Sequence, residues 1–441
     1  MATVIPIRGI RYNRAKVGDL SQVVTPPYDI IDSVAQARYY ANDPSNIIRL
    51  ELGQIFAQDD EKNNRYTRAA SYFTRWQEEE ILVREEKPAL YLYEQEFDLR
   101  GEKKVRTGFI CGIHLEPYSK GNILPHEETL SKPKADRLQL MRACQANFSP
   151  VFGLYADAEN LINQTLSEAR QNRPADVEFT DEAGETHRLW VITDPTALTT
   201  VVNYMANKPV YIADGHHRYE TALSYAEEMQ SQGLTGYDTV LMTLVNLYDP
   251  GMLILPTHRL VKNIRNLDFP RLKEQLNAYF DLKAFPIPAG KEENQQIITD
   301  FFKLLEEKGK SGHAFGMYSR DRVLYLLTMR PECSPQDLLD PKRSAAWRNL
   351  DVAILDNLIL DQMLGIGSEQ RKNQDHLTYT RSEEEALNLV NSGVDQLAFF
   401  LNPTQVEEVT AVAAAGDKMP QKSTYFYPKL ITGLVINPLG K

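Results

Sequence analysis

Blocks of apolar periodicity predict that helices and strands alternate along this chain. Helical spacing of apolar residues predicts helices over residues 62–80, 131–146, 159–171, 269–280, 293–308, 350–364 and 383–392. Short apolar runs bounded by turn residues predict strands over residues 47–52, 89–97, 105–115, 151–155, 187–193, 239–248, 314–317, 322–329 and 396–401. The pattern therefore predicts an α+β fold, that is, a mixed α/β protein.

One stretch places an acid, a glycine, two histidines and an arginine where a predicted strand turns into a predicted helix. The apolar run Val210–Ile212 precedes it, a helical pattern over 221–229 follows, and the stretch reads Ala213-Asp-Gly-His-His-Arg-Tyr-Glu220. Backbone N–H groups at a helix N-terminus are unpaired, and the helix dipole favours anions there. The sequence therefore predicts a phosphate site in this turn.

The side chains of the turn suit that ligand. Gly215 permits a sharp turn or a close approach of the backbone to a ligand. His216, His217 and Arg218 offer hydrogen-bond donors, and an arginine binds phosphate through two parallel bonds. We expect Asp214 to bind Mg²⁺ or to orient a histidine. The alternative is that Asp214 caps the helix and the histidines are solvated on its first turn.

A second cluster supplies candidates for the base that phosphorylation of an alcohol requires. His126, Glu127 and Glu128 follow one another in Leu124-Pro-His-Glu-Glu-Thr129, which is otherwise a solvated acidic loop ahead of a helix. Lys134 and Arg137 come next, either as phosphate ligands or as ordinary surface residues.

Three further pairs of polar residues are candidates for the same site. They are Tyr28 with Asp29 for the substrate, and His258 with Arg259 and Lys422 with Ser423 for phosphate. Each pair also has a structural alternative. Tyr28 and Asp29 could end a rigid proline turn, His258 and Arg259 could mark a strand end, and Lys422 and Ser423 could lie in an edge strand whose lysines discourage aggregation.

Composition narrows the class of protein. The 441 residues suggest two to three domains, and the proline-containing stretch at 285–290 is the predicted linker. The net charge of −11 disfavours binding to nucleic acid or anionic membranes. Three widely spaced cysteines, and no evident signal peptide or membrane span, predict a reduced cytoplasmic protein. The sequence motifs of P-loop kinases, Rossmann dehydrogenases, α/β-hydrolases and zincins do not occur.

Six separated motifs resemble a bacterial and archaeal family known only as domain of unknown function 1015. They lie at residues 25–29, 124–130, 136–138, 212–222, 255–259 and 419–429, so the resemblance extends from about residue 5 to the C-terminus. The Asp-Gly-His-His-Arg element also resembles the phosphate-binding turn of the ParB/sulfiredoxin-like fold, which includes ParB CTPases, sulfiredoxins and free L-serine kinases. Histidines stand where sulfiredoxins carry a cysteine, which disfavours sulfiredoxin chemistry.

The resemblance implies a ParB/sulfiredoxin-like catalytic region over residues 1–285 and a C-terminal α/β region over 286–441 that closes on the site. It implies a kinase that phosphorylates free L-serine, with pyrophosphate or a nucleotide as donor and Mg²⁺ as cofactor. A ParB-like CTP- or ATP-binding switch and a phosphate-ester or nucleotide hydrolase remain alternatives. The expected partners are small molecules, not nucleic acid or membrane, and the sequence leaves a homo-oligomer open.

Overall fold

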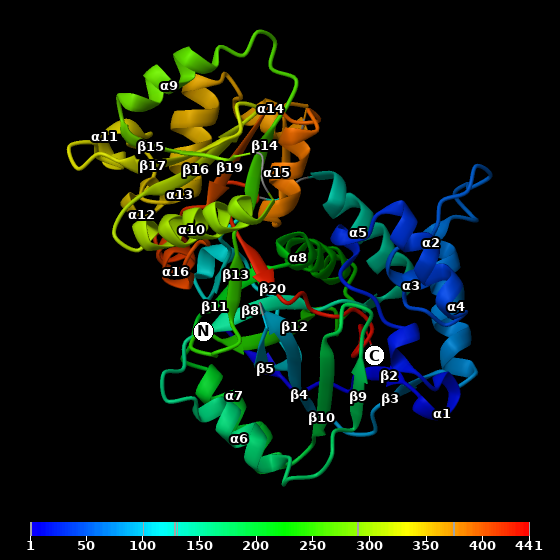
Figure 1. The fold of residues 1–441 in the computed structure, drawn as a ribbon. Helices are drawn as coiled ribbons and strands as arrows, with labels where there is room; N and C mark the ends of the chain where they lie inside the picture. Colours follow the sequence, from blue (N-terminus) through cyan, green and yellow to red (C-terminus); the bar gives the residue numbers. More distant parts are fainter. Residues whose placement is uncertain are drawn as a thin grey trace. The chain divides into compact units, whose positions relative to one another are not determined.

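The computed structural model describes residues 2–99, 101–127, 129, 131–288, 291–373 and 375–440. The chain forms two compact units (Figure 1). Unit 1 comprises Met1–Pro125, Thr129–Leu253 and Phe426–Lys441, and unit 2 comprises His126–Glu128 and Ile254–Tyr425. Unit 1 is therefore discontinuous in sequence, because its last segment follows the main part of unit 2.

Among the described residues, nine strands of unit 1 form one mixed sheet in the order β6-β11-β8-β12-β5-β4-β10-β9, with β1 paired to β5. The strands are β1 Val4–Ile5, β4 Leu90–Leu99, β5 Glu102–His114, β6 Ile123–Leu124, β8 Val151–Tyr155, β9 Val177–Thr180, β10 Thr186–Ile192, β11 Val210–Asp214 and β12 Thr239–Asn246. The strands predicted at 89–97, 105–115, 151–155, 187–193 and 239–248 are confirmed.

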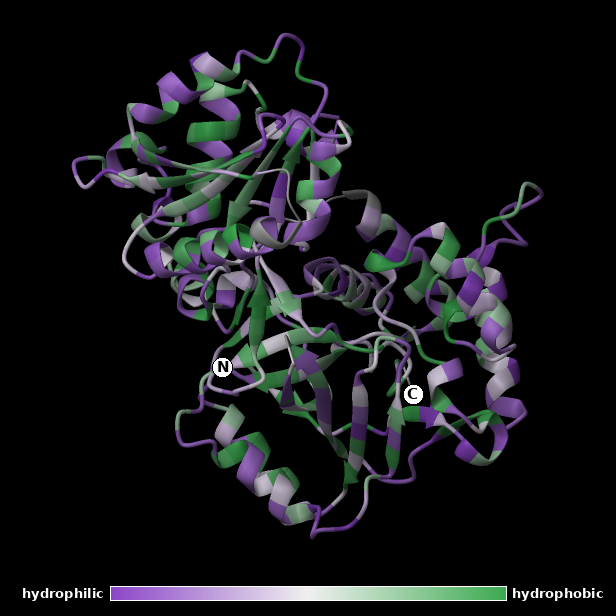
Figure 2. Cartoon of the chain, viewed as in Figure 1, coloured by the Kyte–Doolittle hydropathy of each residue, from purple (hydrophilic) through white to green (hydrophobic). Residues whose placement is uncertain are grey.

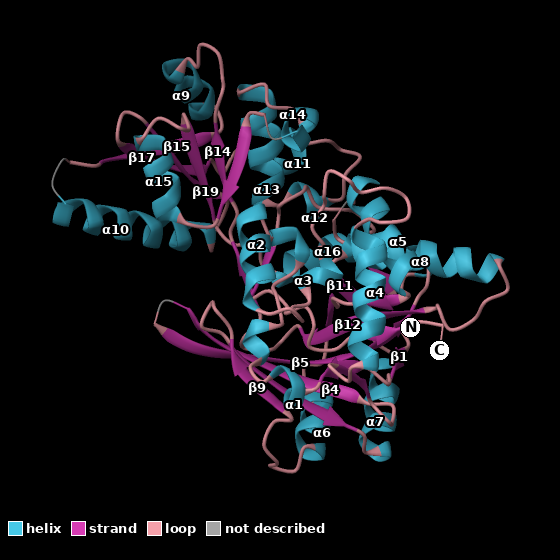
Figure 3. Ribbon diagram, turned by 90° about the vertical axis from the view of Figure 1, so that its right-hand side faces the viewer, coloured by secondary structure: helices cyan, strands magenta, loops and turns pink. Residues whose placement is uncertain are grey.

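Three helices pack their apolar residues into one core with this sheet. They are α6 Leu161–Ala169, α7 Pro195–Met205 and α8 His216–Ser231. Figure 3 distinguishes the helices from the strands by colour. The other helices of unit 1 are α1 Arg14–Val17, α2 Ser33–Asn42, α3 Ile48–Glu51, α4 Arg65–Glu78 and α5 Ser131–Cys144. Two further strand pairs are β2 Ile10–Tyr12 with β3 Leu82–Arg84, and β7 Ala146–Asn147 with β21 Asn437–Pro438.

Unit 2 contains an antiparallel sheet in the order β15-β17-β16-β19-β14-β18. Its strands are β14 His258–Val261, β15 Phe280–Pro286, β16 Ala314–Ser319, β17 Val323–Met329, β18 Leu377–Thr380 and β19 Leu397–Leu401. Its longer helices are α9 Phe269–Asn277, α10 Lys291–Gly309, α15 Glu383–Asn391 and α16 Val406–Ala414. In both units the helices carry hydrophobic and hydrophilic residues side by side, as amphipathic helices do (Figure 2).

The mixed α/β class is confirmed, while two local predictions need correction. Residues 47–52, predicted as a strand, contain the short helix α3, Ile48–Glu51. The Asn46 side chain accepts a hydrogen bond from the Ile48 N–H (2.9 Å) and so forms a turn just before this helix. The apolar helix predicted at 350–364 begins as α13, Asp351–Ile354, and continues as a π-helix, η4 Leu355–Met363.

The division into units also differs from the boundary predicted at residue 285. Residues Phe280–Pro286 form β15 and pair along their length with β17, so this stretch is an edge strand of unit 2. Ala289 and Gly290 of the predicted linker lie outside the described residues. No described helix is long and apolar enough to span a membrane. The three cysteines are free thiols, and Cys111 and Cys144 are buried.

Candidate functional site

The sharp turn between β11 and α8 depends on a single glycine. β11 ends at Asp214 after an irregularity in its pairing with β8, and α8 begins at His216. Gly215 between them has a φ of 90°, in the left-handed region that favours glycine. Asp214 accepts a hydrogen bond from the Gly215 N–H (2.8 Å), and within the described residues no side chain caps α8. The alternative in which Asp214 is the helix cap is therefore wrong.

Arg218 packs directly against this glycine. A Cβ atom at Gly215 would lie 2.9 Å from the Nε atom of Arg218 and 3.0 Å from its Cζ. The guanidinium is held there because its Nη1 donates to the carbonyl oxygen of Pro150. Gly215 thus serves both the backbone turn and the position of the arginine that follows it.

Asp214 lies among positive charges. The Nζ of Lys429 donates to its Oδ2 (3.0 Å), and the Nη2 of Arg218 lies 3.9 Å from the same oxygen. Burial raises the pKa of Asp214, but Lys429 and Arg218 outweigh that effect and hold the pKa well below its usual range. The Gln95 side chain donates to the backbone carbonyl of Lys429 (2.9 Å), which fixes this segment against β4.

These contacts bear on the predicted Mg²⁺ ligand. One oxygen of Asp214 accepts from a lysine and the other from a backbone N–H, so a cation there would have to displace Lys429. The residues present do not fit a metal ion held by Asp214. They fit an anion, because Lys429, Arg218 and the start of α8 all contribute positive charge.

His217 lies between charges of both signs. Burial is the largest effect and lowers its pKa; Glu220 and Asp29 act in the opposite direction, and Lys134 and Arg218 add to the lowering. The net result is a pKa below the usual value, so His217 is mostly neutral at pH 7. Glu220 itself accepts hydrogen bonds from Lys134 (2.9 Å) and from Thr129 (2.6 Å), which link the start of α8 to the segment around α5. His216, by contrast, is buried.

Arg137 is a buried structural residue beside the site. Its guanidinium donates to the carboxylate of Glu51 (3.1 Å) and to that of Asp136 (2.8 Å), and it stacks 4.1 Å from the ring centre of Tyr28. Ser149 donates a further hydrogen bond to Glu51 (2.8 Å). With its donors bound to protein carboxylates, Arg137 positions Tyr28, a role that differs from the predicted contact with phosphate.

Tyr28 and Asp29 lie in unit 1 with the turn. Burial is the main cause that raises the pKa of Tyr28 to about 12, against the lowering effect of Arg137 and Arg218. Asp29 is exposed, and its charge acts on His217. Tyr28 and Asp29, the pair predicted to bind substrate, are therefore within electrostatic range of the turn between β11 and α8, and Asp29 presents a carboxylate to solvent.

The remaining sequence candidates belong to unit 2. The His126 ring contacts the hydroxyl of Thr424 (3.1 Å), its carbonyl accepts from Met419 (2.6 Å), and Glu127 forms a backbone bridge with Met419. Glu128 lies outside the described residues. Glu127 and Glu128 therefore remain predictions for the base.

His258 and Arg259 are core residues of unit 2. Burial lowers the pKa of His258 to about 3, with a smaller contribution from Arg259, and the ring packs edge-on against Phe400. Arg259 is fully buried, lies 3.5 Å from the Asp356 carboxylate and donates to the carbonyl of Lys422 (3.1 Å). A neutral buried histidine is a poor phosphate ligand, so the structure gives His258 a packing role.

Lys422 and Ser423, the C-terminal pair predicted to bind phosphate, differ in their surroundings. The Ser423 hydroxyl donates to the backbone carbonyl of Pro420 (2.5 Å), so it serves the local turn. The Lys422 side chain is exposed. Sequence reasoning selected Lys422 in this stretch and missed Lys429, which is the lysine that contacts Asp214. The only sequence feature that could have indicated Lys429 was the high content of basic residues at 418–429.

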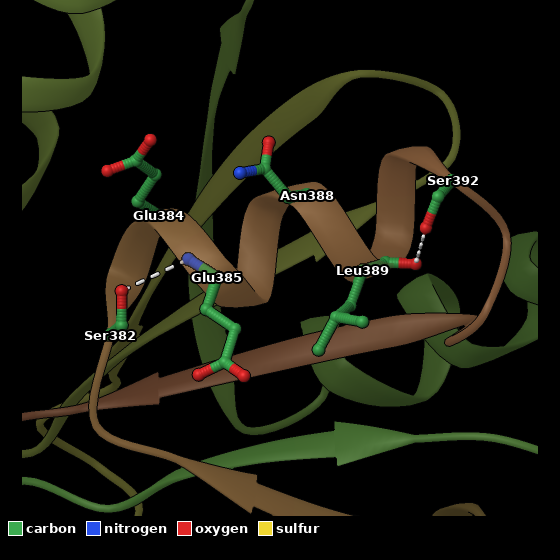
Figure 4. A pocket seen from close by; sticks show the side chains of 6 residues that line it. All are labelled: Ser382, Glu384, Glu385, Asn388, Leu389 and Ser392. Atoms are coloured by element: carbon green, nitrogen blue, oxygen red, sulfur yellow. Dashed lines mark hydrogen bonds between the residues drawn. The ribbon is translucent and has the colours of Figure 1, made fainter.

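A pocket of about 450 Å³ on α15 does not suit the binding of a phosphate donor. Ser382, Glu384, Glu385, Asn388, Leu389 and Ser392 line it (Figure 4). The Ser382 and Ser392 hydroxyls make local hydrogen bonds to the helix backbone, and Glu385 accepts from Thr380. Two carboxylates and no basic residue among these six would repel an anionic donor.

The sequence matches the model of one family, described as "Protein of unknown function (DUF1015)", over residues 4–353. The chain belongs to the DUF1015 family. No curated protein matches it. This DUF1015 member shows weak likeness to several solved structures. A free serine kinase mutant with AMP has 14% identity and a TM-score of 0.39, and the match covers 78% of this chain and 95% of the kinase. The free serine kinase with ADP has 13% identity and a TM-score of 0.36, and the match covers 72% of this chain and 89% of the kinase.

A conserved hypothetical protein from Pyrococcus furiosus gives 16% identity, a TM-score of 0.32, and coverage of 71% of this chain and 93% of that protein. At these scores the likeness carries no functional argument, and the ParB/sulfiredoxin-like core remains a prediction. The function proposed for this DUF1015 chain must therefore rest on its own residues.

Proposed function

We propose that this protein is a small-molecule phosphotransferase whose unit 1 binds a phosphate donor at the N-terminus of α8. The observation that carries the proposal is the combination of an uncapped helix start, a left-handed glycine, and Lys429 and Arg218 around Asp214. Backbone N–H groups and fixed cations of this kind stabilise phosphate oxygens without reorganisation. Lys134, which pairs with Glu220, adds a further cation near the start of α8.

The acceptor half of the reaction requires a carboxylate beside a hydroxyl. Two carboxylates act electrostatically on His217, and of these Glu220 is held by Lys134 and Thr129 whereas Asp29 is exposed. We therefore assign Asp29 as the first candidate base, with Glu127 and Glu128 as the alternatives from sequence. The acceptor oxygen would attack the terminal phosphorus as the bond to the leaving phosphate breaks, and the carboxylate would take the hydroxyl proton.

Free L-serine is the proposed acceptor, and pyrophosphate or a nucleotide the proposed donor, following the resemblance of the Asp-Gly-His-His-Arg turn. The test is to incubate the full chain with L-serine and pyrophosphate, ADP or ATP, with and without Mg²⁺, and to measure O-phosphoserine by mass spectrometry. A panel of other hydroxy amino acids checks the acceptor. Absence of product with every donor and acceptor would refute the transferase. Tight nucleotide binding without product would favour the switch, and phosphate release without an acceptor would favour the hydrolase.

Two substitutions locate the site. Lys429→Met should weaken pyrophosphate binding at least tenfold, about 1.4 kcal/mol, because it removes a cation and leaves Asp214 to repel the donor. Lys120→Met is the matched control, since Lys120 is an exposed lysine of unit 1 that pairs only loosely with Glu116 (4.0 Å). Asp29→Asn should lower turnover while donor binding persists. Equal effects of the two lysine changes would show that the site lies elsewhere.

A further inference from the structure

A second cluster of polar side chains in unit 1 lies at the turn that joins β9 to β10. Asp181 begins this turn, and its Oδ1 accepts hydrogen bonds from the backbone N–H groups of Ala183 and Glu185, both 2.9 Å. Its other oxygen, Oδ2, lies 3.3 Å from the Nε2 of His187. Asp181 thus uses one oxygen to hold the turn and directs the second at the imidazole.

His187 is fully buried and firmly oriented. Its Nδ1 shares a hydrogen bond of 2.7 Å with the Tyr93 hydroxyl, and its ring stacks on Phe179 with centres 4.9 Å apart. Its Nε2 faces the Asp181 carboxylate at 3.3 Å but forms no well-aligned hydrogen bond within the described residues. A buried ring nitrogen that faces a carboxylate in this way needs an explanation, because buried polar atoms are normally satisfied.

Glu185 completes the cluster. Its side chain is buried and accepts a hydrogen bond from Tyr427. The donor atoms of Asp181, Glu185 and His187 all lie within 4.8 Å of one another, and this is the one such group of three found in the described part of the chain. Imidazole and carboxylate are ligands that Zn²⁺ accepts at about 2.0–2.2 Å. Two ligands at that distance with a tetrahedral angle stand about 3.3–3.6 Å apart, and the 3.3 Å between His187 Nε2 and Asp181 Oδ2 lies at the lower end of that range.

We propose that Asp181, Glu185 and His187 bind one Zn²⁺ ion per chain, a site separate from the phosphate turn. The Tyr93 hydroxyl holds Nδ1 and so presents Nε2 to the metal, as outer partners of zinc-bound histidines commonly do. Two carboxylates neutralise the ion, so the nearby Arg106 guanidinium faces a site without net charge. The ion would satisfy the histidine and fix the β9–β10 turn.

The cluster is also linked to the segment that carries Lys429. Tyr427 contacts Glu185, and Gln95 accepts from Arg106 while it donates to the Lys429 carbonyl. Gln95, Arg106 and His187 are neighbours across three strands, because Gln95 is opposite both of the others in the register of β4, β5 and β10. Zinc at this turn would therefore stabilise the position of Lys429 without contacting the donor.

The test uses the full chain after chelator treatment and dialysis. Zn²⁺ is titrated against a chromophoric chelator, with Mg²⁺ as a comparison ion, and thermal unfolding is followed in parallel. We expect one equivalent of Zn²⁺ to bind, a higher Tm with zinc, and at least a hundredfold weaker binding in Asp181→Asn and in Glu185→Gln. Glu182→Gln is the matched control, because this neighbouring carboxylate pairs with Arg38 and lies outside the cluster. It should bind zinc as the unmodified chain does.

Two results would overturn the proposal. One is the absence of stoichiometric zinc binding by the unmodified, folded chain. The other is zinc binding that survives both Asp181→Asn and Glu185→Gln, which would place the ion elsewhere. If Asp181→Asn disturbs folding by circular dichroism, Glu185→Gln decides alone, because Glu185 makes no side-chain contact with the backbone of the turn among the contacts described. These measurements need no donor or acceptor, so they stand whether or not the protein is a phosphotransferase.

Discussion

Replacement of Gly215 by alanine tests the link between backbone geometry and anion binding. The new Cβ would be strained at a φ of 90° and would lie 2.9–3.0 Å from the Arg218 guanidinium. The left-handed conformation costs a non-glycine residue about 1–2 kcal/mol, and the stiffer unfolded chain offsets about 0.4–1 kcal/mol of this. To relieve the contact, Arg218 must give up its hydrogen bond to Pro150, which is worth about 1.5–3 kcal/mol for a charged donor.

Gly101→Ala is the control that isolates the second effect. Gly101 has a φ of 85°, and a Cβ atom there would meet nothing within 4 Å. Both variants carry the same backbone strain, so Gly215→Ala should lose about 1.5–3 kcal/mol more in free energy of unfolding than Gly101→Ala. Urea denaturation measures the stability, and calorimetric titration with pyrophosphate measures donor binding, which should fall at least tenfold in Gly215→Ala alone. If both variants lose equal stability and bind pyrophosphate equally, the account of Arg218 is refuted.

Three other predictions concern side chains that can carry a charge. Arg137→Met should destabilise the protein by about 3–5 kcal/mol, because it leaves the Glu51 carboxylate buried without its partner; a loss below 1 kcal/mol in urea denaturation would contradict this. His258 is neutral in the fold with a pKa of about 3, so stability should fall by about 1.4 kcal/mol per pH unit as pH drops from about 6.5, where the unfolded chain takes up the proton, and should level off near pH 3. His258→Gln should remove that part of the slope in denaturation curves measured from pH 7 to 5. For His217, whose pKa is lowered mainly by burial, binding of an anionic donor should be coupled to proton uptake, and calorimetry in buffers of different ionisation enthalpy should show less uptake in His217→Gln.

The parts of this protein that could be predicted from sequence are those set by local pattern. The strand–turn–helix around Gly215 is such a part, since an apolar run, a glycine and a helical pattern follow one another directly. The prediction for residues 47–52 was wrong because their apolar residues fit both a period of two and a single helical turn, and the turn that Asn46 forms with the Ile48 N–H leads into a helix. Periodicity cannot resolve so short a segment.

The site could be predicted only on the side that is contiguous in sequence. Lys429 pairs with Asp214 across 215 positions of the chain, and no spacing rule connects them. The sequence analysis chose Arg137 for its charge, but its role follows from its ion pairs with Asp136 and with the buried Glu51, and the sequence reveals neither pairing. The residue types indicated that the site could bind an anion. The tertiary fold determines which charged side chains are available to a ligand and which form ion pairs within the protein.

The discontinuity of unit 1 has a consequence for biosynthesis. Lys429 belongs to the segment Phe426–Lys441, which joins unit 1 only after the whole of Ile254–Tyr425 has been made. During translation the strands and helices up to Leu253 can collapse, but the phosphate turn then lacks its lysine, and Asp214 stands beside Arg218 alone. The proposed donor site would therefore be completed late, when unit 2 has already emerged from the ribosome.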